Sequence, residues 1–226
     1  MFVGHYAAGL AIKSAYPKFH LGWVLLNVQA LDFLNAGFSL AGIESAEVAH
    51  GAPATDPYIL HYPISHSLAG AVVFSAVSAG LYWALTNRRV SDAKRGALIV
   101  GIAAFSHFFL DVFTHHALPL TPSSSVTLGL GLGHYVLPTI ALELSLLLAA
   151  AILYWHRVSS TLLGDLTLLV FIAIIAAPFL ALLSDPPPAE PSFGASMTVL
   201  SIFTVFAALG ALMDWFRNRQ RAQMKA

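Results

Sequence analysis

The stretch GALIVGIAAFSHFFLDVFTHH, residues 96–116, decides which class of fold this chain adopts. Its apolar length is close to the roughly 20 residues that a helix needs to cross a bilayer. Three polar residues interrupt it at i, i+4 and i+8, namely His107, Asp111 and His115, and this spacing places them on one face of a helix. A polar stripe that faced lipid would be costly, so we expect it to face the interior of a helical bundle.

The composition of the whole chain agrees with this interpretation. Of its 226 residues, 58% are hydrophobic and only 10% are charged, which is typical of an integral membrane protein. We predict an all-α fold with a single domain over residues 1–226, built as a polytopic transmembrane helical bundle of six spans plus a shorter N-terminal membrane helix. The shorter helix is expected at 2–16, and the six spans at 21–43, 64–86, 96–115, 134–155, 161–184 and 195–216. The absence of cysteine excludes disulfides and thiolate metal sites, and the net charge of zero gives no sign of nucleic-acid binding.

The basic residues predict the topology. All eleven lie in four places that alternate along the predicted spans, so they can share one side of the membrane, the cytoplasmic side. These places are Lys13 with Lys18, the segment from Arg88 to Arg95, Arg157, and the tail from Arg217 to Lys225. The loops between them carry acidic residues and no Lys or Arg: Glu44, Glu47, Asp56, Asp185 and Glu190. We therefore expect a multi-pass protein with a cytoplasmic C-terminus.

Residue counts along the predicted helices bring further polar groups to the depth of His107. At ~1.5 Å per residue, His107 lies about 17 Å from the cytoplasmic end of its helix. Three groups on other helices reach about 18–20 Å by the same count: His5, Asp32 and Glu143. Three histidines near the outer ends can cap this layer: His61, His66 and His134. We therefore expect one shared polar site that opens to the outer side.

The residue types in this layer suit a metal ion. Imidazole and carboxylate ligands without sulfur are typical of Zn, Mn or non-haem Fe, and two carboxylates leave room for a pair of ions. A polar clamp between helices is the alternative for the stripe, with Asp111 accepting a hydrogen bond from a Ser or Tyr. His61 could likewise be an interfacial residue, with Ser65 as the cap of the next helix. Glu143 could be a metal ligand, a general base or a partner that orients an imidazole. Gln29 could form a hydrogen bond within the site, or it could only form a hydrogen bond between two helices.

Other motifs are informative mainly through what they exclude. GLGLGH, residues 129–134, follows no predicted strand and is expected to be a flexible outer loop, whose exposed amides beside His134 could bind an oxyanion. The chain has no HExxH, which argues against a site-2-type zinc protease. It also has no GxSxG and no rhomboid-like serine with a paired histidine.

The order of these motifs resembles that of small polytopic membrane-bound metal-dependent hydrolases. Over roughly residues 1–120, the matching positions are Gly4-His5, Asp32, the run from His61 to Leu68, and Ser106-His107 through Asp111 to Thr114. The resemblance implies a protein of the bacterial inner membrane with these metal ligands: His5, Asp32, His61, His66, His107 and Asp111. Where such proteins often carry Pro-Asp-x-Asp-His, this chain has Ala30 and Phe33, so one carboxylate and one imidazole are missing. This difference weakens the case for two ions and leaves open a site without catalytic activity, although His115 could compensate.

The leading hypothesis is a metal-dependent hydrolase that acts on an ester or phosphoester of a lipid or lipid-linked molecule near the outer leaflet. An ion in the site would supply hydroxide from water at neutral pH, and the predicted catalytic residues would move protons: Glu143, His115 and His134. One alternative is a non-haem iron enzyme of the desaturase or hydroxylase type, because HYPISH fits one of its histidine boxes, although the chain lacks HxxHH. Another is a non-enzymatic transporter or assembly factor that binds metal or relays protons.

Overall fold

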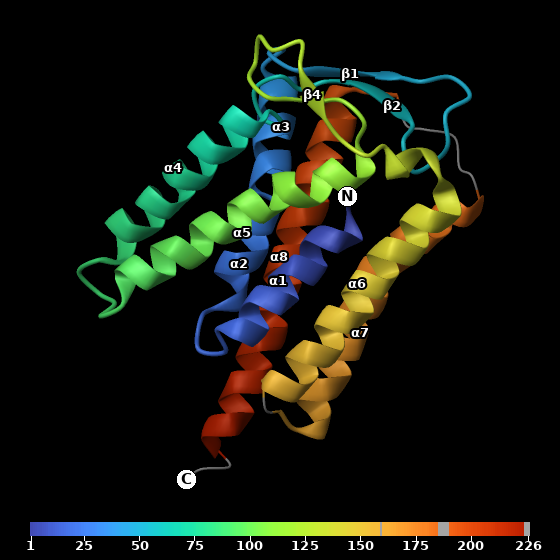
Figure 1. Cartoon of the computed structure of the whole chain (residues 1–226). Helices are drawn as coiled ribbons and strands as arrows, with labels where there is room; N and C mark the ends of the chain where they lie inside the picture. The colour runs from blue at the N-terminus through green and yellow to red at the C-terminus, as the bar shows by residue number, and fades with distance from the viewer. Residues whose placement is uncertain (159, 185–189, 224–226) are drawn as a thin grey trace.

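Helices form most of the structure, and short strands connect them at one end (Figure 1). The computed structural model describes residues 1–158, 160–184 and 190–223, and 69% of the chain is helical. The helices are α1 (Val3–Ala15), α2 (Leu21–Val28), α3 (Ala30–Leu40), α4 (Leu68–Thr86), α5 (Ala93–Thr114), α6 (Val136–Arg157), α7 (Leu162–Leu180) and α8 (Phe193–Gln223). The all-α prediction therefore holds in its main feature. Two short antiparallel pairs were not predicted: β1 (Ser45–Val48) with β2 (Tyr58–His61), and β3 (Leu118–Pro119) with β4 (Thr127–Leu128).

Five helices are long and apolar enough to cross a membrane, and they fall at five of the six predicted spans. They are α4, α5, α6, α7 extended to Ser184, and α8 up to Arg217. The remaining predicted span, 21–43, is divided into α2 and α3, and α1 has only 13 residues. The count of six spans plus a shorter helix therefore stays a prediction, while the polytopic helical architecture is supported.

The break between α2 and α3 lies at Gln29. Its backbone has φ −109° and ψ 9°, and its buried side-chain amide has no hydrogen-bond partner. Non-helical backbone at membrane depth is tolerated where protein surrounds it or where it lines a cavity. Here the break follows Val28, whose carbonyl oxygen accepts a hydrogen bond from His107 of α5. The interruption is therefore part of the site described below.

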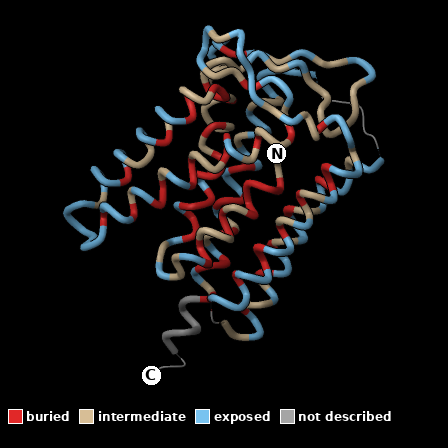
Figure 2. Tube along the Cα trace, viewed as in Figure 1, coloured by how far each residue is buried: buried red, intermediate tan, exposed pale blue. Residues whose placement is uncertain are grey.

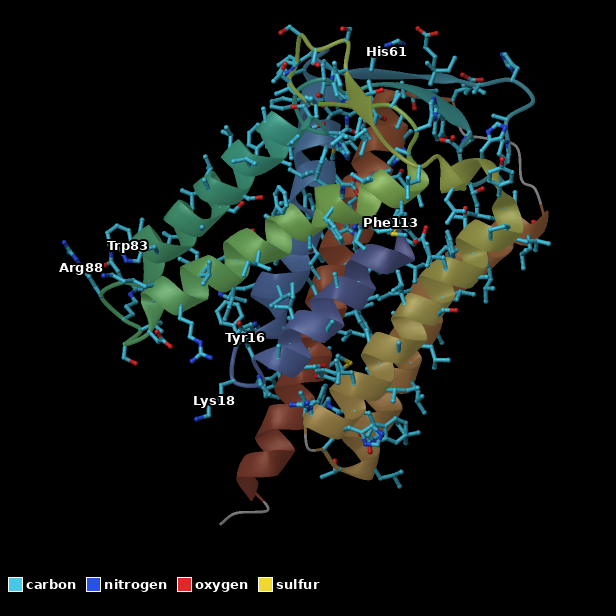
Figure 3. All side chains as sticks on the ribbon, in the orientation of Figure 1. Tyr16, Lys18, His61, Trp83, Arg88 and Phe113 are labelled. Atoms are coloured by element: carbon cyan, nitrogen blue, oxygen red, sulfur yellow. The ribbon has the colours of Figure 1, made fainter. Side chains whose placement is uncertain are left out.

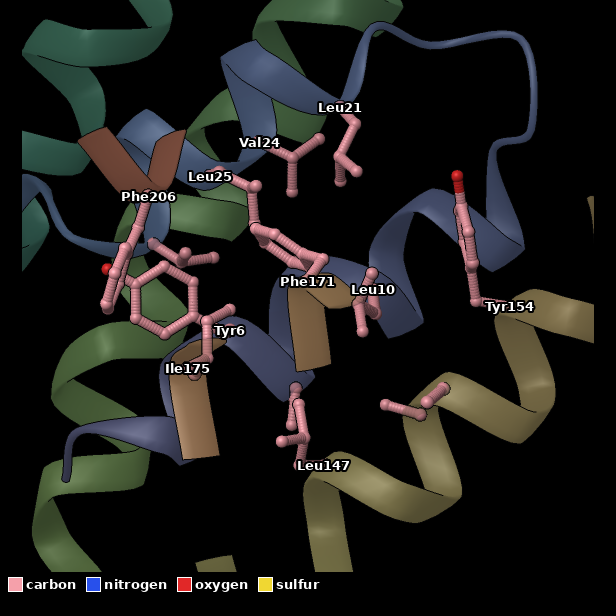
Figure 4. Packing of buried hydrophobic residues seen from close by; sticks show 14 of the residues in the cluster. Tyr6, Leu10, Leu21, Val24, Leu25, Leu147, Tyr154, Phe171, Ile175 and Phe206 are labelled. Carbon is pink, nitrogen blue, oxygen red and sulfur yellow. The ribbon is translucent and has the colours of Figure 1, made fainter. Parts of the chain in front are cut away.

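Helix α1 is the central element of the bundle (Figure 1). It packs against α6 on one side and against α2 and α5 on the other, while α8 packs across α2 and α3. Buried positions are concentrated on these inner helices (Figure 2). Tyr6 and Leu10 of α1 are fully buried and belong to one apolar core with Leu25, Phe171 and Phe206 (Figure 4). By contrast, the outer faces of α4 and α7 expose large apolar side chains, as expected for surfaces that face lipid.

The two ends of the bundle differ in charge. The α1–α2, α4–α5 and α6–α7 turns carry basic residues and lie at one end, which we call the basic end. Lys18 and Arg88 lie there, far from His61 at the opposite end, which we call the strand end (Figure 3). Which side of a membrane the basic end faces stays a prediction. Asp185 and Lys225 lie outside the described residues.

Two buried ion pairs fix α8 at the basic end. Lys13 of α1 lies 2.8 Å from Asp214 of α8, and both side chains are 1% exposed. Asp214 also accepts a hydrogen bond from a backbone amide of α2. Three residues further on, Arg217 lies 2.9 Å from Asp165 of α7 and donates to two backbone carbonyl groups near the α6–α7 turn. These contacts join residues that are about 50 to 200 positions apart in the chain.

Candidate metal centre

Ionisable side chains from three helices and one loop meet inside the bundle. The predicted stripe on α5 supplies His107 and Asp111, which are 0% and 1% exposed. Helix α1 adds His5, α3 adds Asp32, and the loop before α4 adds His66. The structure thus brings together five of the six predicted metal ligands. The shared layer lies where α5 crosses α1 and the segment formed by α2 and α3 (Figure 1).

Two imidazole nitrogens and two carboxylate oxygens frame a small space in this cluster. His107 Nε2 lies 3.1 Å from Asp111 Oδ2 and 3.6 Å from Asp32 Oδ1. His66 Nε2 lies 3.5 Å from Asp32 Oδ1 and 3.6 Å from Asp111 Oδ2. We call these four the framing atoms.

Hydrogen bonding fixes which nitrogen of His107 faces the framed space. Its Nδ1 lies 2.8 Å from the carbonyl oxygen of Val28, which can only accept, so Nδ1 carries the hydrogen. When the ring is neutral, Nε2 presents a lone pair to the two carboxylates. A backbone carbonyl on the remote ring nitrogen is the usual arrangement for a histidine that binds a metal ion.

The framing atoms fit a divalent ion by spacing and by chemistry. Neighbouring ligands with bonds of ~2.0–2.1 Å to a tetrahedral ion lie about 3.3–3.4 Å apart. The four N···O separations here are 3.1 to 3.6 Å. His107 Nε2 and Asp111 Oδ2 are also buried without a hydrogen-bond partner, which is costly for groups that nothing bridges. These ligand types suit the predicted Zn, Mn or Fe.

His5 lies beside the framed space, on the other oxygen of Asp111. Its Nε2 is 3.3 Å from Asp111 Oδ1, and its ring stacks on that of His107 with centroids 3.8 Å apart. His5, Asp32 and His107 each offer a ligand atom within 4.8 Å of one another. Both ring nitrogens of His5 are buried without a hydrogen-bond partner. The predicted ligand His5 is therefore within reach of an ion held by its neighbours.

His115 approaches the same oxygen from outside the helix. The stripe was predicted to continue through residue 115, but α5 ends at Thr114 and His115 is extended, with φ −82° and ψ 155°. Its Nε2 lies 3.8 Å from Asp111 Oδ1, which the Met1 amino group also contacts. Burial lowers the pKa of His115 to about 4, against the opposing charge of Asp111. His115 is therefore a neutral imidazole at neutral pH.

Glu143 reaches the cluster only indirectly. This buried residue of α6 accepts hydrogen bonds from the backbone amides of Phe2 and Gly4, at 2.9 and 3.0 Å. These amides belong to the start of α1, where helical N–H groups lack partners within the helix. These contacts fix the start of the helix that carries His5, and the three roles predicted for Glu143 stay predictions.

Two of the predicted residues lie at the rim. His61 is 54% exposed, and its Nε2 lies 3.8 Å from Glu47, so the structure does not bring it to the framing atoms. His134 is the last residue of a short 3₁₀ helix, Leu132–His134, at the strand end. Both line a cavity of about 480 Å³ together with His66 and His115. The expected opening above the cluster is therefore present at the strand end. Burial also raises the pKa of Asp56 at this rim.

The start of α4 differs from the prediction. The helix begins at Leu68 and its cap is Ser67, whose hydroxyl accepts from the amide of Gly70 at 3.0 Å. Ser65, which was the predicted cap, instead contacts the Nδ1 of His66 at 2.8 Å and donates to Glu44 at 2.6 Å. Sequence reasoning placed Glu44 only among the acidic loop residues. Nothing local could reveal its role, because Glu44 is 21 residues from Ser65.

The GLGLGH loop supports His115 instead of presenting free amides. The amides of Leu130, Gly131 and His134 already donate to backbone carbonyls, two of them in the segment from Val112 to His115. The predicted oxyanion site is therefore not formed by these three groups. Gly129 allows the close approach, because its φ is +145° and a Cβ there would lie 2.2 Å from the carbonyl oxygen of His115.

Alanine at Gly129 is expected to destabilise the protein by about 1–3 kcal/mol more than alanine at Gly51, because it adds a clash with His115 to the backbone strain. Gly51 is the matched control, since its φ is +81° and nothing lies within 4 Å of its missing Cβ. Thermal unfolding in detergent measures both variants. Equal losses of stability in the two variants would contradict the predicted clash with His115.

No family model, curated protein or solved structure matches this chain.

Proposed function

We propose that this chain is a membrane-embedded metal-dependent hydrolase of the bacterial inner membrane, with its C-terminus in the cytoplasm. Its substrate is an ester or phosphoester of a lipid or lipid-linked molecule near the outer leaflet. One observation carries the proposal: the buried Nε2 of His107 and Nε2 of His66 both face two carboxylate oxygens, at 3.1 to 3.6 Å. A metal cation between them would be bound by the imidazole lone pairs and by the carboxylate oxygens.

The residues of the proposed site have different roles. Two overlapping groups of three could hold an ion, His66 with His107 and Asp111, and His5 with Asp32 and His107, so that His107 would be a ligand in either case. A divalent ion supplies Lewis acidity there and makes water acidic enough to yield hydroxide at neutral pH. His115 is the residue best placed to exchange a proton with water or substrate, because it lies 3.8 Å from Asp111 and lines the cavity.

The surroundings support an amphiphilic substrate. A second cavity of about 560 Å³ also reaches His115 and continues along apolar side chains of α7 and α8. Its apolar lining includes Phe2, Phe179, Leu182 and Val199. An acyl chain suits such a lining, while an ester or phosphoester beside His115 would lie next to the cluster.

Apolar packing below the cluster favours a site that is closed toward the basic end over a continuous polar path through the membrane. Beneath the cluster, Leu10, Leu21 and Leu25 are fully buried in apolar core. The polar pair below them, Lys13 with Asp214, is itself buried and engaged. Among the described residues, these features separate the cluster from the basic end.

The test is metal analysis of detergent-purified protein together with hydrolysis assays on lipid esters and phosphoesters. We expect stoichiometric Zn, Mn or Fe in the unmodified protein and its loss in His107→Ala, along with loss of hydrolysis. His156→Ala is the matched control, because His156 is an exposed residue of α6. Protein that stays free of metal after reloading would refute the metal centre. Metal without hydrolysis would favour a carrier, and iron with oxygen-dependent turnover would favour the desaturase type.

A further inference from the structure

Glu44 is a buried carboxylate that the proposed chemistry does not use directly. It is 3% exposed and lies in the loop between α3 and β1. Its Oε1 accepts from the backbone amides of Ile64 and Ser65, both at 2.8 Å. Its Oε2 accepts from the hydroxyl of Ser65 at 2.6 Å and from the side-chain amide of Asn35 at 3.1 Å. Four donors thus surround Glu44, and its oxygens act as acceptors.

These bonds determine the direction of the next one. A serine hydroxyl has a single hydrogen, and Ser65 donates it to Glu44. The oxygen of Ser65 can then only accept from His66 Nδ1, which lies 2.8 Å away. His66 therefore carries a hydrogen on Nδ1, and in the neutral ring its Nε2 presents a lone pair.

The Nε2 lone pair of His66 faces two carboxylate oxygens, which would otherwise favour a hydrogen on Nε2. Asp32 Oδ1 and Asp111 Oδ2 lie 3.5 and 3.6 Å from His66 Nε2, and carboxylates by themselves favour the tautomer with hydrogen on Nε2. The contacts from Glu44 through Ser65 oppose that preference. An imidazole held in this way can bind a cation between the two carboxylates without first releasing a proton.

We infer that Glu44 and Ser65 are positioning residues that hold His66 in the Nδ1–H tautomer and so keep its Nε2 available as a ligand. This inference rests on the proposed metal centre for its purpose, but the tautomer itself is a property of the protein without metal. The carbonyl oxygen of Val28 fixes a hydrogen on Nδ1 of His107 in the same way. A carbonyl cannot reverse its role, whereas the relay through Ser65 can be reversed by substitution.

Glu44→Gln reverses the relay with little change in shape. The amide oxygen of glutamine can still accept from the backbone amides, while its NH₂ group donates to Ser65. Ser65 then donates to His66 Nδ1, which moves the ring hydrogen to Nε2 and removes the ligand lone pair. Asn35→Ala is the matched control, because it removes one hydrogen bond to Glu44 and leaves the contacts of Ser65 with Glu44 and His66 in place.

The experiment measures the tautomer and the metal affinity separately. Nitrogen NMR of ¹⁵N-histidine-labelled, metal-free protein reports the His66 tautomer, with the signal assigned by a His66→Gln variant. We expect Nδ1–H in the unmodified protein and in Asn35→Ala, and Nε2–H in Glu44→Gln. Competition with a zinc chelator should show affinity about 10–100-fold weaker in Glu44→Gln than in Asn35→Ala. Ser65→Ala removes the relay without reversing it. Both the His66 tautomer and the zinc affinity should change in the same direction in Ser65→Ala as in Glu44→Gln.

The two proposals fail in different ways. If the metal-free, unmodified protein shows Nε2–H on His66, or if Glu44→Gln keeps Nδ1–H, the positioning role is overturned whatever the metal data say. Zinc affinity in Glu44→Gln equal to that of Asn35→Ala also overturns it. If the tautomers are as expected but the unmodified protein binds no metal, the metal centre fails, and the role of Glu44 reduces to fixing the tautomer.

Discussion

Replacing Asp111 with asparagine is expected to weaken metal binding by more than about 100-fold, the upper end of what loss of an outer partner costs. Oδ2 of Asp111 faces both His107 and His66, at 3.1 and 3.6 Å. An amide in its place carries no charge, and its NH₂ group donates where a ligand must accept. Metal content by mass spectrometry after reloading, together with competition by a chelator, measures the change. Hydrolysis should be lost with the metal.

Asp92→Asn is the control for this substitution. Asp92 precedes the same helix, α5, but its side chain is 65% exposed at the basic end. It should retain the metal content of the unmodified protein. If Asp111→Asn also retained it, the cluster would be a polar clamp between helices, as the alternative interpretation of the stripe holds.

Replacing Lys13 with methionine is expected to reduce the free energy of unfolding by about 3–5 kcal/mol. The reason is the carboxylate that remains: Asp214 is 1% exposed and would lose the ammonium group 2.8 Å away. An uncompensated buried charge costs more than the ion pair gains over an apolar pair. Unfolding in mixed micelles with rising denaturing detergent measures the loss.

Two further variants separate charge burial from other causes. The double variant Lys13→Met with Asp214→Leu should recover part of the loss, because neither charge of this pair is then left uncompensated, while the backbone amide of Leu21 loses its acceptor. Arg95→Met removes a partner of Asp92 in an exposed pair 3.9 Å apart and should cost less than about 1 kcal/mol. Equal losses in Lys13→Met and Arg95→Met would show that burial of the pair contributes little.

The sequence allowed the cluster to be predicted where helical geometry alone decides it. His107 and Asp111 share a face because they are four residues apart, and His5 and Asp32 reach the same layer because each helix rises by a fixed amount per residue. These predictions needed only the positions of the turns. The residues at the basic end marked those turns.

Other features depend on contacts between distant residues, and the sequence does not show them. The break at Gln29 follows no Pro or Gly, and its backbone is accommodated by the protein packed around it. The role of Glu44 depends on a loop 21 residues away, and that of Asp214 on a lysine 201 residues away. His61 belongs to the matching motif but lies at the rim, because β2 pairs with β1 and holds it there.

The positions of the four framing atoms along the chain determine when during synthesis the set becomes complete. They belong to residues 32 to 111, and α6, α7 and α8 contribute none of the four. A nascent chain first contains the whole set when residue 111 has been added, before α6, α7 and α8 have been synthesised. If the proposed ion binds there, its loading does not require α6, α7 and α8 to be inserted first.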